Sequence, residues 1–449
     1  FKFPNGYDKT QPLVIDPDIV FVTYSGSVAN NFGNAATYGE NGTLYSAGIV
    51  FGQDFPLTNG AFNIDYEGAV DIGILKFDKE GRNLLYGAFL GGEDTDTPHS
   101  MIMNSNNELV IMGSTSSVEF PTTFNALQDV FQGGTPTSPP SGTYTKGSDI
   151  FISKISSSGN SLLASTYLGG TENDGLGEAD ILVNNYGDEF RGDVFTDAAN
   201  NIYIASSTAS PDFPIVGTVS TFSGGERDAV VVKMNSNLSA INWSRFVGGN
   251  GTETGNSVKV NSFGEVFICG GTSSNNFSPT VGAAIGGQTD AYVAKFNANT
   301  GALLASRMLG TDNHDQGYFL DFDPDGSVYI LGSTFGTYPV SGGVYSNPDA
   351  GHFLHKLTSN LQTTLLTTSI GRDNDAPPLA LTAFLVSDCG DIYLSGWGGL
   401  VNGGYNNASS SSDLPITDDA YRSTTNGRNF YLIDCMRVYQ FLKKKFLKN

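Results

Sequence analysis

Acidic residues recur at one kind of place in this chain, directly after strands that end in glycine. They are Glu93, Asp94, Asp96, Glu172, Asp174, Glu253, Asp312, Asp315, Asp373 and Asp375. If the units that carry them form a ring, these carboxylates converge around one mouth of its central channel. Such a cluster would bind Ca²⁺ or another hard cation, since these ions take several oxygen ligands, or a basic ligand. The alternative is a solvated rim, because Asp is a common turn residue.

His314 lies between Asp312 and Asp315 and is the best candidate for a titrating group, since an unperturbed imidazole changes charge near neutral pH. Two carboxylates with this histidine would supply the groups that a hydrolase or lyase needs for general acid–base catalysis. The chain shows no His-based metal motif. No nucleophile elbow, phosphate loop or dinucleotide fingerprint occurs in its required strand–turn–helix setting.

A second acidic cluster spells D-x-D-x-D-G with Asp321, Asp323, Asp325 and Gly326. This is how a calcium loop opens, and the three carboxylates are therefore candidate metal ligands. An EF-hand would continue to a Glu where this chain has Gly332, and the flanks read as strands. The other interpretation is a β-turn between two strands. No cofactor is required under either interpretation, and Ca²⁺ is the ion that the first would bind.

The pattern Asp-x4-Lys occurs at Asp71/Lys76, Asp149/Lys154, Asp228/Lys233 and Asp290/Lys295. Its recurrence argues against catalysis, because an active site needs a unique arrangement. Residues five apart on a strand point to opposite faces, so the two members of a pattern do not pair. We expect the Asp to bind the turn that leads into its strand, and the Lys to make a structural contact between units.

These patterns belong to six copies of one unit, which open at Gly26, FLGG, YLGG, FVGG, MLG and SIG. Each copy continues with an acidic loop, a strand, a Gly/Asn turn, a second strand and a Pro-containing loop. Four short strands rich in Val, Ile, Tyr and Phe per copy make one blade of a propeller. The expected fold is an all-β, six-bladed β-propeller of four-stranded antiparallel blades. The segment DIVFVTYSG would complete the last blade, close the ring and hide its sheet edges.

The propeller accounts for residues 18–434. Residues 1–17 read as a linker from an upstream domain. Residues 435–449 hold five of the 23 basic residues and read as a basic tail, a tether or an altered C-terminus. The net charge of −22 argues against nucleic acid and anionic membranes as partners. No transmembrane stretch is evident in the sequence.

The motifs YLGG, D-x-x-G-N/D-x-Y, F-P and D-A-x-V-x-K resemble the bacterial β-propeller repeats known as SBBP repeats. PLVIDPDIVFVTYSG and DCGDIYLSGWGG are similar to the propeller region of gliding-motility-associated surface proteins of Bacteroidetes. The resemblance covers about residues 12–434. It implies export, through the type IX route, to the cell surface or the medium. It carries no enzymatic activity to transfer.

Three insertions depart from the repeat, at 127–148, 171–190 and 397–413, and all are expected on one face of the ring. Loops on a rigid scaffold commonly bind ligands. Tyr144, Trp397 and Tyr405 would stack on sugar rings or anchor a protein partner there. The favoured function is an exported, non-enzymatic binding or structural module of a multi-chain surface assembly, with a protein or glycan ligand. The alternatives are a carboxylate/His hydrolase or lyase at the channel mouth, with or without Ca²⁺, and a spacer without a ligand.

Overall fold

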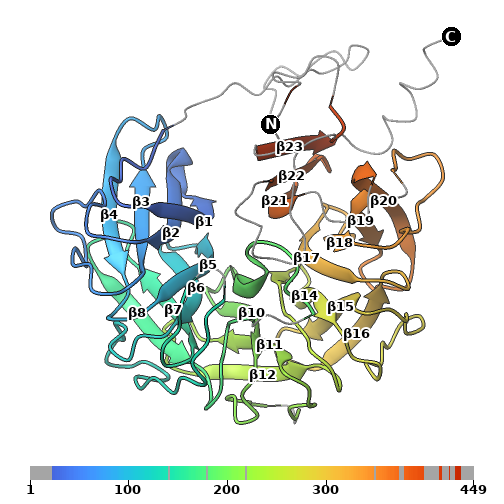
Figure 1. Ribbon diagram of the computed structural model, residues 1–449, viewed down its shortest axis with the longest axis horizontal. Coiled ribbons are helices and arrows are strands. Elements are labelled where there is room, and N and C mark those ends of the chain that lie inside the picture. Colours follow the sequence, from blue (N-terminus) through green and yellow to red (C-terminus); the bar gives the residue numbers. More distant parts are fainter. Residues whose placement is uncertain are drawn as a thin grey trace.

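The computed structural model describes residues 23–139, 142–177, 181–217, 220–347, 350–373, 379–398, 414–416, 424 and 430–435. These residues form six antiparallel sheets, five with four strands and one with three. Consecutive sheets stand side by side around a common centre (Figure 1). This is the arrangement of a β-propeller with one sheet per blade.

Blade one contains β1 (Asn31–Tyr38), β2 (Leu44–Val50), β3 (Asp71–Phe77) and β4 (Leu84–Leu90), with the short helix η1 (Glu40–Gly42) between β1 and β2. Blade two contains β5 (Asp96–Met103), β6 (Leu109–Thr115), β7 (Asp149–Ile155) and β8 (Leu162–Leu168). Blade three contains β9 (Asp193–Thr196), β10 (Ile202–Thr208), β11 (Asp228–Met234) and β12 (Ile241–Val247). The short helix η2 (Asp188–Phe190) precedes β9.

Blade four contains β13 (Ser257–Val260), β14 (Glu265–Thr272), β15 (Asp290–Asn297) and β16 (Leu303–Leu309). Blade five contains β17 (Asp315–Phe322), β18 (Val328–Thr334), β19 (Ala350–Leu357) and β20 (Thr364–Asp373). The sixth sheet contains β21 (Ala380–Val386), β22 (Ile392–Trp397) and β23 (Phe430–Cys435). The first strand of each blade is the innermost, and these strands contact one another in the order β1, β5, β9, β13, β17, β21.

The middle strands are covered on both faces. Every residue of β3, β7 and β11 is buried, which explains why these segments are mainly apolar between their Asp and their Lys. The apolar side chains of adjacent blades interlock, as in the cluster that joins Val110 and Ile152 of blade two to Val194 and Val232 of blade three. The core is therefore a series of sheet-to-sheet interfaces.

The Gly/Asn turns of the repeat are explained by backbone geometry. The turn between the first two strands of a blade holds at least one residue in the left-handed region, where side chains other than those of Gly and Asn are strained. They include Asn41, Asn107, Asn200, Gly264, Gly326 and Gly390. Gly326, the glycine of D-x-D-x-D-G, therefore occupies a turn position that recurs in every blade.

The repeated lysines connect neighbouring blades, as predicted. Each Nζ donates a hydrogen bond to a carbonyl oxygen in the turn between the third and fourth strands of the next blade. The pairs are Lys76 to Ser157 (2.7 Å), Lys154 to Ser236 (2.9 Å), Lys233 to Ala298 (3.0 Å) and Lys295 to Ser359 (3.2 Å). Two of the aspartates bind the turn that leads into their strand, also as predicted: the amides of Glu67 and Gly68 donate to Asp71, and that of Ser223 donates to Asp228. Asp149 accepts the amides of Gln132 and Gly133 in the longer blade-two insertion.

Closure of the ring by DIVFVTYSG lies mostly outside the described residues. Its described part, 23–26, is not a strand, and β23 pairs only with β22 among the described strands. Most of the linker and tail assignments also fall outside the described residues. In the part of the chain that the structure describes, no helix is long and apolar enough to cross a membrane.

Replacing Lys233 by Met should lower the free energy of unfolding by about 1.5–3 kcal/mol. The Met side chain keeps the apolar stem, but the Ala298 carbonyl loses its charged donor and Tyr203 loses the ammonium that lies 5.1 Å from its ring centroid. Urea denaturation followed by circular dichroism measures the change. Lys79→Met is the matched control, because the Lys79 side chain is exposed and its ammonium pairs with Glu80 in its own turn. Equal midpoints for the two variants would contradict an inter-blade role.

Candidate functional site

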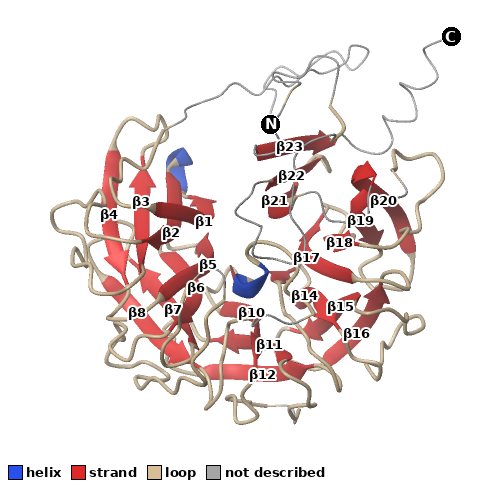
Figure 2. Ribbon diagram, viewed as in Figure 1, coloured by secondary structure: helices blue, strands red, loops and turns tan. Residues whose placement is uncertain are grey.

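The insertion that precedes β9 lies in the middle of the propeller. Figure 2 shows its short helix η2 at the centre, among the innermost strands. Leu182, Val183, Glu189 and Phe190 are all buried. We call the described residues 171–177 and 181–192 the central segment. The sequence predicted an exposed elaboration here, and that prediction is wrong for the buried residues, because an apolar run packs into the axis of the propeller.

Asp188 holds the central segment together. Its carboxylate accepts the backbone N–H groups of Asn184 (3.0 Å) and Asn185 (2.7 Å) and the hydroxyl of Tyr318 on β17 (3.2 Å). The Arg191 guanidinium lies 3.5 Å from this carboxylate and 4.4 Å from the Tyr318 ring centroid. Burial raises the pKa of Asp188 to about 6.

The central segment also reaches the sixth sheet. Asn185 Nδ2 donates to the carbonyl of Leu379 (2.8 Å), and Arg191 donates to that of Leu381 (3.2 Å). On the opposite side, the Phe190 ring packs against His99 of β5. One segment thus bonds or packs to blades two and five and to the sixth sheet. These contacts hold the central segment between the innermost strands.

His314 faces the central segment, not solvent. Its Nε2 accepts a hydrogen bond from Asn184 Nδ2 (3.2 Å), so its Nδ1–H donates to Thr289 Oγ1 (2.6 Å). The ring packs on Phe335, with 4.6 Å between centroids. Burial lowers the pKa of His314 to about 4, and the imidazole is therefore neutral at pH 7. This environment does not suit the titrating group that the sequence suggested.

Tyr144 was predicted to be an exposed binding aromatic, and this prediction is wrong. The side chain is fully buried against Leu176 and Phe190, and its hydroxyl donates to Thr97 Oγ1 (2.8 Å). The blade-two insertion therefore packs down onto the central segment. Nearby, Lys146 of this insertion forms ion pairs with Glu93 (3.2 Å) and Asp94 (3.4 Å).

The acids that follow the glycine-ended strands fall into two groups. Glu93, Glu172 and Asp312 are exposed, as a solvated rim requires. Asp96, Asp174, Glu253 and Asp315 are buried, and each accepts the backbone N–H of the second residue after the preceding strand: Gly92 (2.8 Å), Gly170 (2.7 Å), Gly249 (2.9 Å) and Thr311 (2.6 Å). The second group lies in the blade junctions and does not converge on an open mouth.

Asp321, Asp323 and Asp325 are not brought together as a calcium site. Asp321 accepts the backbone N–H of Val386 in the sixth sheet (2.8 Å). Asp323 accepts the amides of Asp325 and Ser327 within the turn and pairs with Lys356 (2.7 Å). Asn104, Asp197 and Asn261 cap the corresponding turns in the same way. Among the described residues, no group of three or more His, Cys, Asp or Glu side chains could hold a metal ion.

The remaining predicted residues are only partly visible. Trp397, at the end of β22, is half-buried and meets Tyr186 of the central segment edge to face, with 5.0 Å between centroids. Asp373 ends β20, and its side chain is not described. Asp375 and Tyr405 lie outside the described residues.

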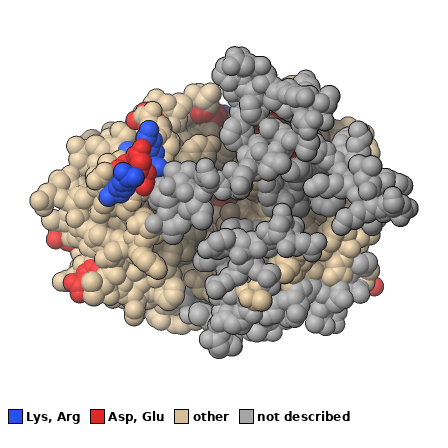
Figure 3. Space-filling model, turned by 90° about the horizontal axis from the view of Figure 1, so that it is seen from above, with Lys and Arg blue, Asp and Glu red and all other residues tan. Residues whose placement is uncertain are grey.

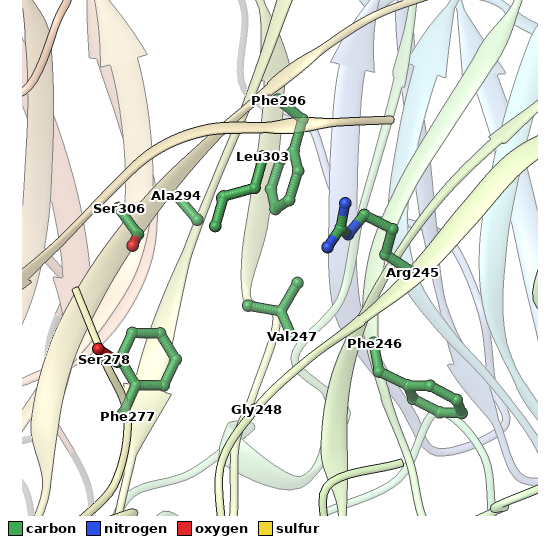
Figure 4. A pocket seen from close by; sticks show the side chains of 10 residues that line it. All are labelled: Arg245, Phe246, Val247, Gly248, Phe277, Ser278, Ala294, Phe296, Leu303 and Ser306. Carbon is green, nitrogen blue, oxygen red and sulfur yellow. The ribbon is translucent and has the colours of Figure 1, made fainter. Parts of the chain in front are cut away.

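We describe two small cavities of the propeller. One, of about 180 Å³, lies between blades three and four, where Arg245 points toward Phe296 and Leu303 (Figure 4). Its guanidinium also donates to the Gly301 carbonyl (3.1 Å). The other, of about 240 Å³, is lined by Asp312, Asn313 and Thr334 together with neighbouring residues of blade five. Both are smaller than the ~300–1,000 Å³ usual for ligand pockets.

Charge does not mark a binding face on the side shown in Figure 3. The described surface there is mostly uncharged, and its most prominent charged group mixes both signs. The sequence reasoning missed Asp188, Arg191 and Asn184, which organise the centre. The signal that could have found them is the apolar run ILV at 181–183 inside a segment otherwise taken as an acidic loop.

No family model matches this chain, and no curated protein matches it. Among solved structures it is similar to a Dyadobacter fermentans protein of unknown function, at 12% identity and a TM-score of 0.41 over 86% of this chain and 92% of that one. It is also similar to the NanB sialidase of Streptococcus pneumoniae (8%, TM-score 0.47, 95% and 71%) and to an α-L-arabinanase of Penicillium chrysogenum (12%, TM-score 0.42, 87% and 95%). The sialidase and the arabinanase are β-propeller proteins. At these identities the likeness concerns the fold alone.

All four histidines should remain neutral between about pH 5.5 and pH 8. Burial lowers the pKa of His314 and His352 to about 4 and that of His99 and His355 to about 3. Because these values lie below the unfolded value, the histidines weaken the fold as the pH falls below about 6.5. Imidazole proton shifts followed by NMR measure this. A His314 midpoint near 6.5 would contradict the buried geometry.

Replacing Asp188 by Ala should lower the free energy of unfolding by at least about 2 kcal/mol, because two backbone N–H groups and Tyr318 lose their acceptor in a buried place. Thermal denaturation measures the loss. Glu172→Ala, an exposed acid at the start of the same segment, should change little. An Asp188→Ala protein as stable as the control would show that the central segment is dispensable.

Proposed function

We propose that this chain is an exported, non-enzymatic β-propeller that serves as a binding or structural module of a cell-surface or extracellular assembly. The observation that carries the proposal is the central segment, which lies among the innermost strands and is bonded to them (Figure 2). The segment is bonded to β17 and the sixth sheet through Asp188 and Asn185. A scaffold cross-linked in this way is suited to presenting its outer surface.

The alternative, a hydrolase or lyase, finds less support. General acid–base catalysis needs two titrating groups within reach of one substrate. The cavity beside blade five has one ionisable lining residue, Asp312, while the adjacent His314 is turned toward Asn184. The buried acids of the blade junctions accept protein donors and face no cavity of substrate size described above.

A protein or glycan ligand would dock beside the Tyr186–Trp397 pair. Both side chains are half-buried and present parts of their rings, and Ile181 of the same segment is 44% exposed. Aromatic rings of this kind stack on sugars or anchor protein partners. The proposal requires no cofactor. It includes six blades, closure of the ring by residues 18–26, and export as the resemblance to gliding-motility proteins implies.

Binding and turnover assays on the same protein test the proposal. We expect no hydrolysis of an α-sialoside, an arabinan or a lactone, and we expect saturable binding to a member of a panel of bacterial polysaccharides and surface proteins. Trp397→Ala should weaken that binding at least tenfold, a typical loss for a central aromatic anchor of about 2 kcal/mol or more. Phe124→Ala, a fully exposed aromatic in another loop, is the matched control. Turnover that Asp312→Asn abolishes would contradict the proposal and support the enzyme.

A further inference from the structure

Buried carboxyl groups meet in pairs at four of the blade junctions. One member is the Asp that opens the third strand of a blade, and the other is the acid five residues after the glycine that ends the fourth strand. The pairs are Asp71 with Asp96, Asp149 with Asp174, Asp228 with Glu253, and Asp290 with Asp315. All eight residues are buried. Two buried negative charges so close together are strongly unfavourable unless a positive charge or a proton joins them.

The glycine that ends the fourth strand shows how close the two carboxyl groups of a pair are to each other. A Cβ on Gly248 would lie 2.4 Å from Asp228 Oδ1 and 2.6 Å from Glu253 Oε2. Gly91, Gly169 and Gly310 are hemmed in by their own pairs in the same manner. The recurring glycine at the end of the fourth strand is therefore required, because any side chain would displace both carboxyl groups.

The donors around the third pair leave one oxygen without a partner. Glu253 accepts the Gly249 N–H at Oε2 (2.9 Å) and the hydroxyls of Thr272 (2.6 Å) and Ser274 at Oε1. Asp228 accepts the Ser223 N–H at Oδ2 (2.7 Å), while its buried Oδ1 has no protein donor. The two side chains are within hydrogen-bonding reach of each other. A proton on Asp228 Oδ1 would donate to Glu253 and complete this network.

The sequence shows that the two acids occur as a unit. Where the fifth copy has Gly351 in place of the strand-opening Asp, the residue five after Gly371 is Ala376. Where the sixth copy has Asn429, the residue five after Gly26 is Asn31. No copy keeps one acid and loses the other. Asn429 and Ala376 lie outside the described residues, so this comparison concerns their identity alone.

From this geometry we propose that each of the four carboxyl pairs shares one proton, which bonds adjacent blades, and that loss of these protons loosens the ring as the pH rises. The charged and titratable groups around the third pair are Tyr292 of β15, and Arg227, whose guanidinium donates to the Leu176 carbonyl in the central segment. Ca²⁺ usually takes six to eight oxygen ligands. The two carboxyl groups here, already engaged with N–H and O–H donors, suit a proton better.

The sign of the pH effect follows from burial. Desolvation raises the pKa of Asp96, Asp149, Asp228 and Asp290 to about 7. Since this lies above the unfolded value near 4, the stabilisation is complete below about pH 4 and is lost as the pH rises through about 7. Between about pH 6.5 and pH 4 the buried histidines change the stability in the opposite direction, because they weaken the fold as the pH falls. A variant must therefore be compared with the wild type at each pH.

Asp228→Asn is the decisive variant. Its amide oxygen can accept the Ser223 N–H, and its Nδ2–H₂ can donate permanently to Glu253 in place of the shared proton. We expect a thermal midpoint about 2–4 °C above that of the wild type at pH 8, and a difference that shrinks or reverses toward pH 5. Glu172→Gln, an exposed acid, should give no pH-dependent difference. A constant destabilisation at every pH would overturn the proposal.

Two measurements on the wild type complete the test, including the case in which Asp228→Asn does not fold. Infrared spectroscopy should show a protonated-carboxyl band at pH 6 that disappears in the folded protein as the pH rises to about 8. Absence of this band at pH 6 would overturn the proposal.

Addition of CaCl₂ at pH 8 should leave the thermal midpoint unchanged. A rise in the midpoint would instead identify the pairs as cation sites and overturn the shared proton.

Discussion

Burial of polar groups between apolar sheets is the constraint on which this structure depends. Each blade covers its neighbour, so any charged group in a junction must find a partner there. The lysines solve this problem by donating to a carbonyl of the next blade, as Lys233 does to Ala298. The carboxyl groups solve it by accepting backbone amides and facing one another across a glycine. The junctions are thus held by polar contacts as well as by apolar packing.

The centre of the ring obeys the same constraint. Innermost strands end in polar groups that would need water in an open channel, and the central segment replaces that water with its own donors and acceptors. Asn184 satisfies His314, while Asp188 satisfies Tyr318. The innermost strands thus surround a segment of the chain itself (Figure 2), which directs attention to the outer surface and to the Tyr186–Trp397 pair.

Much of the fold could be predicted from the sequence because repetition multiplies weak signals. The Gly/Asn turns and the roles of the Asp-x4-Lys residues follow from positions that recur. The central segment occurs once, so its structure could not be predicted from repetition. It is rich in Asp and Glu and was therefore interpreted as an acidic loop, although residues 181–183 are apolar. The burial of Tyr144 depends on that segment and was missed with it. Glu172 and Asp174 are both acidic, yet the first is exposed and the second is buried. This difference depends on how the loop lies against the next strand, which the residue types alone do not indicate.

Hydrogen exchange of the central segment tests the account most directly. The amides of Asn184 and Asn185 are bonded to Asp188, and that of Gly177 to the Glu189 carbonyl. The account predicts that these amides exchange as slowly as those of β11 and become labile together in Asp188→Ala. Exchange as fast as that of the exposed residues Ser157, Ser158 and Asn160 would show that the central segment is open, and it would contradict both its cross-links and the function inferred from them.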